Sequence, residues 1–277
     1  MNPLEIFSYP PLLRGLAALV AAGISFPLVG VFILRLHLVT LKFTLMHAAF
    51  LGGALALAAG IDPLLFGFGM TLLIILALAP LARAAKINEG YVSALFMVTA
   101  AAAAFIIIYK LSVPAKEVFS LLWGNVFSLG TIDLSLTLIW TGLILGFVLF
   151  AFRRISAVLF DREIAFSAGV NEKLYSNLIA LCAGFTVTLA LKLLGALLLD
   201  SILLLPALAA FLVARSAKGL FLLSLCLGLL YAVGGFFSAV ILDVPASSGV
   251  TAAGAAGFII CFIISKITAS RRGRRMT

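Results

Sequence analysis

Apolar residues in this chain form long blocks that short polar segments separate. The blocks lie at residues 13–34, 43–60, 64–82, 90–109, 134–152, 176–198, 201–214, 220–241 and 249–266. Most match the roughly 20 residues with which a helix crosses ~30 Å of hydrocarbon, and they lack the alternating pattern of membrane-barrel strands. The pattern predicts an all-α polytopic membrane protein with about nine transmembrane helices. Eight or ten are the alternatives, because the block at 201–214 is short for a full crossing.

The composition supports a membrane location for nearly the whole chain. Of 277 residues, 64% are hydrophobic and only 10% are charged, with a mean hydropathy of +1.29. A water-soluble domain of this size would not remain soluble with so apolar a composition. The polar segments are too short to fold alone. We therefore expect residues 1–277 to form a single transmembrane domain, and any soluble module to come from another chain.

The net charge of +9 could suggest nucleic-acid binding, but the basic residues follow a topological pattern. Alternate connections hold 15 of the 19 Lys and Arg residues. These are Arg35, Lys42, Arg83, Lys86, Arg153, Arg154, Arg162, Lys173, Arg215, Lys218, Lys266, Arg271, Arg272, Arg274 and Arg275. Such an excess marks cytoplasmic loops. The charge therefore predicts topology and no nucleic-acid partner, with the C-terminus inside and, after nine crossings, the N-terminus outside.

The longest of these basic connections covers residues 153–177. A bare link between two spans needs only a few residues. This one has a helical stretch with mixed charges, a stop at Gly169, and Asn171 before a second helix start. It is either an ordinary solvated loop or a short docking helix that binds a cytoplasmic partner.

The sequence carries none of the common catalytic motifs of hydrolases and nucleotide-binding enzymes. It has no nucleophile-elbow serine, no HExxH zinc motif and no GxxxxGK[ST] phosphate loop. We therefore expect that the chain is not an enzyme by itself, and that any ATP hydrolysis takes place on a partner.

Five segments resemble, in order, the conserved patterns of one transporter family. They are LHLVTLKFTLMHAAFLGGALA (36–56), LLWGNVFSLGTIDL (121–134), LFDREIAFSAGV (159–170), LKLLGALLLDSILLLPALAAFLVARS (191–216) and YAVGGFFSAVILDVPASSG (231–249). The chain resembles the permease subunits of bacterial ABC importers of the zinc, manganese and iron class. The third segment looks like the coupling segment of that family, with the pattern D-x-x-x-A-x-x-x-G-[VI].

The resemblance implies a type II ABC importer permease in a bacterial inner membrane. Its partners would be a cytoplasmic ABC ATPase, an extracytoplasmic metal-binding protein and a second permease copy, most simply as a homodimer. The family pattern places four residues of 153–177 at the contact with the ATPase: Asp161, Glu163, Ala165 and Gly169.

A metal ion that crosses hydrocarbon needs imidazole and carboxylate ligands to replace its water shell. His47 lies inside the second span, where it is either a ligand or a buried neutral imidazole bonded to a backbone carbonyl or to Thr44. The family match favours the ligand. The family's aspartate four residues earlier is Phe43 in this chain. His37 lies in a basic connection, where we expect it to be solvated.

Two aspartates complete the candidate metal ligands. Asp200 stands in an apolar run before Pro206, where unwound backbone would need a cavity or protein around it. Its carboxylate could replace the one lost at Phe43, or it could cap the next helix on Leu203 or Leu204, or neutralise Lys192. Asp243 falls on the family's D-x-P pattern and is otherwise a turn aspartate.

These observations predict the membrane-spanning subunit of an ATP-driven importer that moves zinc or manganese into the cytoplasm by alternating access. The first alternative is the same architecture carrying another substrate, such as a metal chelate. The second is an ATP-independent secondary transporter or channel, which would have no use for a coupling segment. Histidine with carboxylates suits several metals, so these residues do not select one.

The charge pattern makes a testable prediction of topology. Residues 83–89, 153–175 and 215–218 should face the cytoplasm, and residues 110–133 and 243–248 should face outward. Single cysteines, introduced after removal of Cys182, Cys226 and Cys261, should react with a membrane-impermeant maleimide from those sides only. Labelling of position 116 from the cytoplasmic side would overturn this topology.

Overall fold

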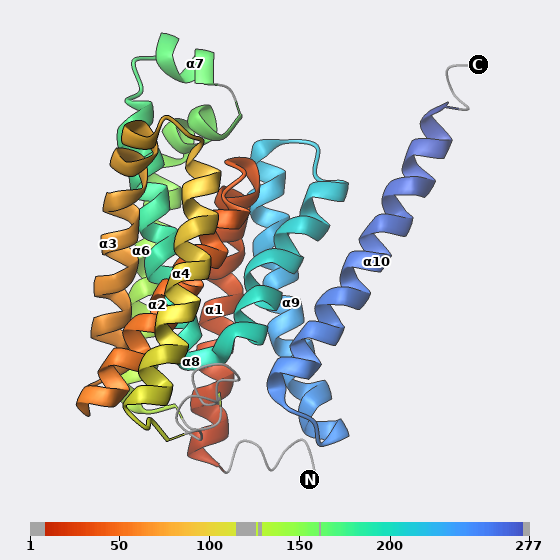
Figure 1. Ribbon diagram of the computed structural model, residues 1–277. Helices are drawn as coiled ribbons and strands as arrows, with labels where there is room; N and C mark the ends of the chain where they lie inside the picture. The colour runs from red at the N-terminus through yellow and green to blue at the C-terminus, as the bar shows by residue number, and fades with distance from the viewer. Residues whose placement is uncertain (1–8, 115–125, 127–128, 161, 274–277) are drawn as a thin grey trace. The chain divides into compact units, whose positions relative to one another are not determined.

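A computed structural model describes residues 9–114, 126, 129–160 and 162–273. The described chain is helical almost throughout (Figure 1). Its helices are α1 (Pro10–Arg35), α2 (Val39–Ala59), α3 (Pro63–Ala85), α4 (Glu89–Lys110), α6 (Thr131–Phe160), α7 (Arg162–Ser167), α8 (Glu172–Val213), α9 (Ala217–Leu242) and α10 (Ala246–Gly273).

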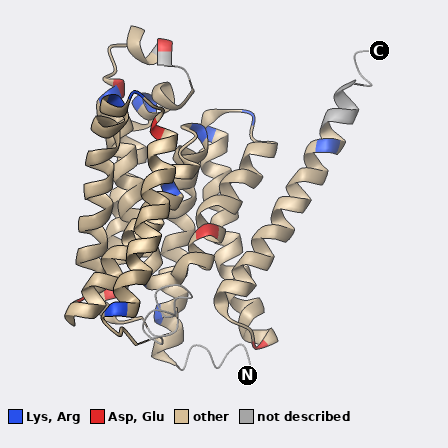
Figure 2. Ribbon diagram, viewed as in Figure 1, with Lys and Arg blue, Asp and Glu red and all other residues tan. Residues whose placement is uncertain are grey.

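Within these described ranges, eight helices are long and apolar enough to cross a membrane. The nine predicted spans fall on these eight helices, because the spans predicted at 176–198 and 201–214 both lie in α8. Figure 1 shows that α1 begins and α10 ends at opposite ends of the compact part of the chain to which both belong. Figure 2 shows most charged residues near helix ends and turns, with few along the apolar middle. The prediction of an all-α polytopic membrane protein is confirmed.

Side-chain caps and left-handed residues end the helices at the turns. Asp62 caps α3 by accepting a hydrogen bond from the Leu64 amide, with Pro63 in the first helical position, and Asn88 caps α4 in the same way. Gly60 ends α2 in the left-handed conformation. These local signals explain why the turns are so short.

By its contacts, the chain divides into two compact units, which we call unit 1 (residues 1–34, 126–150 and 200–277) and unit 2 (residues 35–125 and 151–199). The expectation that residues 1–277 form one transmembrane domain stays a prediction.

In unit 2, α2 packs against both α3 and α4. The Thr44 hydroxyl donates to the Ser93 carbonyl of α4 at 2.7 Å. Contacts also connect α3 with the first part of α8, because the Phe68 and Phe185 rings lie 4.3 Å apart and the Thr188 hydroxyl donates to Thr71 at 3.3 Å. Polar bonds of this kind hold helices together where lipid offers no hydrophobic driving force.

In unit 1, close backbone approach brings helices together. A Cβ atom on Gly23 of α1 would lie 2.8 Å from the Gly228 carbonyl oxygen of α9, so only glycine fits there. The Ser25 and Thr141 hydroxyls share a hydrogen bond of 3.0 Å between α1 and α6. On the other side, α9 packs against α10.

Helix α8 differs from its prediction in the position of its break. The proline at 206 suggests unwound backbone there, but Pro206 lies buried inside the helix. The interruption is at Gly195, with φ 79° and ψ 167°, where two helices join. Almost only glycine adopts this backbone conformation. The boundary between units 1 and 2 follows a few residues later, after Leu199.

Replacement of Gly195 by alanine should therefore destabilise the protein by about 1–3 kcal/mol through backbone strain. The measurement is the melting temperature of the purified protein in detergent. Gly142→Ala is the matched control, because a Cβ atom on Gly142 in α6 would meet nothing within 4 Å. If the two variants melt alike, the strain at position 195 is absent.

Candidate functional site

His47 lies in the third turn of α2, where it is partly buried. Its Nδ1 atom is 2.8 Å from the Phe43 carbonyl oxygen. Because a carbonyl only accepts hydrogen bonds, this contact assigns a proton to Nδ1, and in the neutral form of the ring the lone pair is then on Nε2. A bond of this kind commonly orients a metal-binding histidine. The bond to a backbone carbonyl is the one that the non-ligand alternative required, and it also leaves Nε2 suited to bind a metal.

A buried lysine lies beside Phe43, the residue that stands where the resembling family has aspartate. Lys42 is 0% exposed, and its Nζ lies 3.6 Å from the centroid of the Phe43 ring, in the geometry of a cation–π contact. The sequence suggested a charged connection here, but α2 begins at Val39 and includes Lys42. The five-residue offset from His47 corresponds to about 7.5 Å of helix rise. At about 100° per residue, five residues place Lys42 and His47 about 140° apart around α2.

Asp200 lies inside α8, about one turn past the Gly195 interruption, and is partly buried. It is therefore not the N-cap of the following helix segment. The next residue, Ser201, shares a hydrogen bond of 2.5 Å with Thr251 of α10, whose hydroxyl also donates to the Ser247 carbonyl. Asp200 thus adjoins a partly buried polar contact inside unit 1, near the start of a helix segment whose dipole favours a carboxylate.

Asp243 is an exposed residue that ends α9 in the left-handed conformation, with φ 53°. Asp243 and Asp200 belong to unit 1, whereas His47 belongs to unit 2. Among the described residues, no three His, Cys, Asp or Glu side chains gather to hold a metal ion. The metal-ligand assignment of His47, Asp200 and Asp243 stays a prediction.

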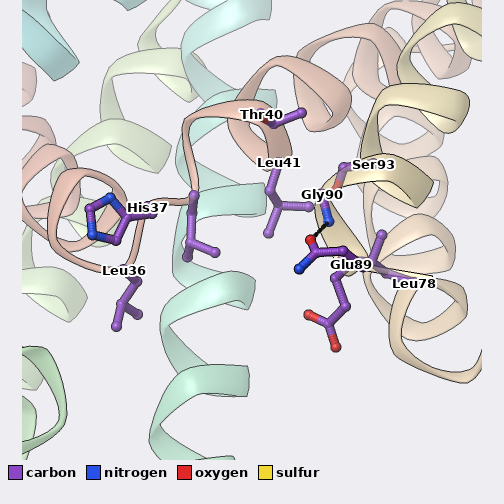
Figure 3. A pocket seen from close by; sticks show the side chains of 10 residues that line it. Leu36, His37, Thr40, Leu41, Leu78, Glu89, Gly90 and Ser93 are labelled. Carbon is purple, nitrogen blue, oxygen red and sulfur yellow. Dashed lines mark hydrogen bonds between the residues drawn. The ribbon is translucent and has the colours of Figure 1, made fainter. Parts of the chain in front are cut away.

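His37 occupies the turn between α1 and α2, is exposed, and has a left-handed backbone with φ 55°. The expectation that it is solvated is confirmed. It borders a cavity of about 370 Å³ formed by this turn, Leu78 of α3 and the start of α4. Figure 3 shows His37 and Glu89 on opposite sides of this cavity, so the two side chains do not point toward a common centre.

The connection between α6 and α8 contains the short helix α7. The predicted stop at Gly169 and helix start after Asn171 are confirmed, because Gly169 has φ 69° and the Asn171 side chain accepts from the Leu174 amide. Of the predicted coupling residues, Glu163 is exposed and Ala165 is 0% exposed. Gly169 is exposed, and Asp161 lies outside the described residues. Sequence reasoning missed Phe166, which is 85% exposed.

Comparisons with known proteins agree with this architecture. A profile of the ABC 3 transport family matches residues 8–265. The chain belongs to the ABC 3 transport family. The predicted resemblance to zinc, manganese and iron permeases is confirmed at the level of the family.

The chain resembles several known proteins along most of their length. This chain is 22% identical to the manganese transport system membrane protein MntC of Halalkalibacterium halodurans, over 98% of this chain and 94% of that protein. It is 23% identical to the high-affinity zinc uptake system membrane protein ZnuB of Haemophilus influenzae, over 91% of this chain and 95% of that protein. The structure of PsaBC from Streptococcus pneumoniae in complex with Fab matches with a TM-score of 0.80 at 23% identity, over 93% of each chain.

Lys192, the residue considered as a partner that neutralises Asp200, forms an ion pair with Asp62. The Lys192 ammonium lies 2.8 Å and 3.2 Å from the two carboxylate oxygens of Asp62. Partial burial by itself raises the pKa of Asp62. The hydrogen bonds from Lys192 and the Leu64 amide, together with the lysine charge, lower the pKa by more than burial raises it, so the net shift is downward. The pair joins the turn before α3 to α8 within unit 2.

The ion pair should therefore stabilise the protein in a pH-dependent way. With the folded pKa of Asp62 lowered, the stabilisation is present above the ordinary carboxyl pKa near ~3.9 and is lost as the pH falls through the lowered value. Asp62→Asn keeps the cap on α3 and removes the charge. A double-mutant cycle with Lys192→Met should give a coupling of about 1 kcal/mol or less at pH 7, because Asp62 is 59% exposed.

The matched control is Asp243→Asn, which makes the same chemical change at an exposed helix end. It should leave the melting temperature unchanged over the same pH range. A coupling energy between Asp62 and Lys192 that does not decline in acid would contradict this account of the pair.

Proposed function

We propose that this chain is the membrane-spanning subunit of an ATP-driven importer that carries a divalent transition-metal ion, zinc or manganese, into the cytoplasm. The observation that carries the proposal is the family match over residues 8–265, combined with eight helices able to span a membrane. The relatives named for manganese and zinc transport support a bare ion over a chelate. They also favour the importer over an ATP-independent transporter or channel.

The proposed complex has further subunits, because the chain carries no phosphate-binding motif of its own. ATP hydrolysis takes place on a cytoplasmic ABC ATPase that binds the 153–177 connection. An extracytoplasmic protein delivers the metal, and a second permease copy completes a homodimer. The complex lies in a bacterial inner membrane, and the ends of the helices with the basic connections face the cytoplasm.

In the proposed transport path, His47 binds the ion through Nε2 and Asp200 supplies a carboxylate. Asp243, at the outer end of α9, meets the ion as it enters. An ionised carboxylate in hydrocarbon costs about 3 kcal/mol or more, so a role in transport explains its presence inside a span. Few protein ligands suit an ion in transit, because the ion must also leave the site.

The test is metal uptake by proteoliposomes that contain the permease and its cognate ATPase, supplied with the binding protein outside. Uptake of radioactive manganese or zinc should require ATP. It should fall at least tenfold in His47→Ala and in Asp200→Asn, while both variants elute as folded protein. Binding should also weaken in acid, because protons compete for the imidazole lone pair.

Thr99→Ala is a matched control, since the Thr99 hydroxyl is exposed on α4 and bonds only within its own helix in the contacts that we describe. Uptake that continues without ATP or without the ATPase would instead support a secondary transporter or channel. Full uptake by Asp200→Asn would remove Asp200 from the proposed site.

A further inference from the structure

A cavity in unit 2 lies at the ends of three helices and has no part in the proposed transport path. Its volume is about 370 Å³, and it is formed by the α1–α2 turn, α3 and the start of α4. Its buried lining includes Leu41, Leu78 and Ser93, and its exposed rim includes His37 and Glu89 (Figure 3). Small-molecule sites have volumes of about 300–1,000 Å³. The cavity is therefore large enough for a small ligand or a lipid headgroup.

The depth of the cavity corresponds to the boundary between lipid headgroups and hydrocarbon. Leu78 lies seven residues before the end of α3, which is about 10 Å of helix rise. The headgroup layer on one side of a bilayer is about 5–7 Å thick, so the cavity extends from that layer into the first part of the hydrocarbon. Most of the surface of α3 and α4 is exposed, and Tyr91 at the start of α4 is 72% exposed, as is typical of an aromatic residue at the membrane interface. Lipid can therefore reach the cavity.

The polar groups of the cavity stand on two sides of it. Glu89 and Ser93 lie one turn apart on α4, whereas His37 and Thr40 come from the α1–α2 turn and the first turn of α2. None of the hydrogen bonds and ion pairs described for this chain engages the Glu89 carboxylate or the Ser93 hydroxyl, although Ser93 is only 2% exposed. A carboxylate and a buried hydroxyl are thus available to a ligand on one side, with an imidazole and a hydroxyl on the other.

This arrangement suits a ligand with two separated, opposite charges better than a metal ion, whose ligands must converge on one point. The Glu89 carboxylate and the Ser93 hydroxyl can both accept hydrogen bonds from a primary ammonium group. The His37 imidazole and the Thr40 hydroxyl can donate to phosphate oxygens. An anionic headgroup would instead meet the like charge of Glu89. Apolar surface for the glycerol and the first methylene groups comes from Leu36, Leu38, Leu41 and Leu78.

We propose that this cavity binds the headgroup of a zwitterionic aminophospholipid, phosphatidylethanolamine, with its ammonium at Glu89 and its phosphate at His37. Pockets between membrane helices at the cytoplasmic side commonly bind lipid headgroups. On the topology set out above, the basic connections place this cavity in the cytoplasmic leaflet. The inference goes beyond the proposed function, since it assigns a lipid site and does not depend on the transported ion.

The test is native mass spectrometry of the purified permease in detergent, supplied with phosphatidylethanolamine, phosphatidylcholine or phosphatidylglycerol of the same acyl chains. Wild-type protein should retain phosphatidylethanolamine at least threefold better than the other two, because phosphatidylcholine has no N–H donor and phosphatidylglycerol has no cation. Glu89→Gln should abolish this preference, and Glu89→Lys should shift it to phosphatidylglycerol. Phosphatidylethanolamine should also raise the melting temperature of the wild type and not of Glu89→Gln, since a ligand stabilises the folded state that binds it.

Glu172→Gln is the matched control. Glu172 is the first residue of α8 and follows an asparagine, as Glu89 is the first residue of α4 and follows Asn88. The same chemical change is thus made at an equivalent helix start that does not line the cavity. The lipid preference of Glu172→Gln should equal that of the wild type.

Two results would overturn the proposal. One is an unchanged preference for phosphatidylethanolamine in a Glu89→Gln variant that melts like the wild type in lipid-free detergent. The other is full displacement of the bound lipid by water-soluble phosphoethanolamine, which lacks the groups that contact the leucines and would assign the cavity to a soluble ligand. The assay contains no ATPase, binding protein or metal, so its outcome is separate from that of the importer proposal.

Discussion

The need to satisfy every backbone hydrogen bond without water shapes this structure. In hydrocarbon an unpaired amide or carbonyl costs several kcal/mol, so a spanning segment must be helical and its turns must lie near water. The short turns obey this rule, with Asp62 and Asn88 capping the helices that follow them. Among the described residues, Gly195 breaks the helical backbone inside the long helix α8, and this residue is buried in protein.

Under this constraint, polar side chains inside the spans stand out. Hydroxyl groups such as those of Thr44 and Ser25 join neighbouring helices, and their bonds account for their presence. His47, Lys42 and Asp200 are different, because an imidazole or a charge is costly to place there and hydroxyl groups would be enough to hold helices together. The proposed transport role gives His47 and Asp200 a reason to be present, whereas the Lys42 ammonium lies over the Phe43 ring.

The sequence predicted the helices well because a crossing requires about 20 consecutive apolar residues, a signal that needs no knowledge of packing. It also predicted the cap at Gly169 and the helix start after Asn171. It misplaced the break in α8, since a proline is a stronger local signal than a glycine, and a buried helix can accommodate the bond lost at Pro206. It could not show the burial of Lys42 or the exposure of Phe166, because both depend on how the helix faces are rotated. Local patterns do not encode contacts between distant parts of the chain, so the pairing of His47 with Asp200 stays a proposal.

The hydrogen bond between His47 and Phe43 has a consequence for how such a site can change over evolution. The imidazole is oriented by the backbone of residue 43 and not by its side chain. Position 43 can therefore exchange a carboxylate for an aromatic ring while the histidine keeps the same direction and the same protonated nitrogen. The side chain at position 43 and the orientation of the imidazole are in this way separable, since a change in one leaves the hydrogen bond that fixes the other.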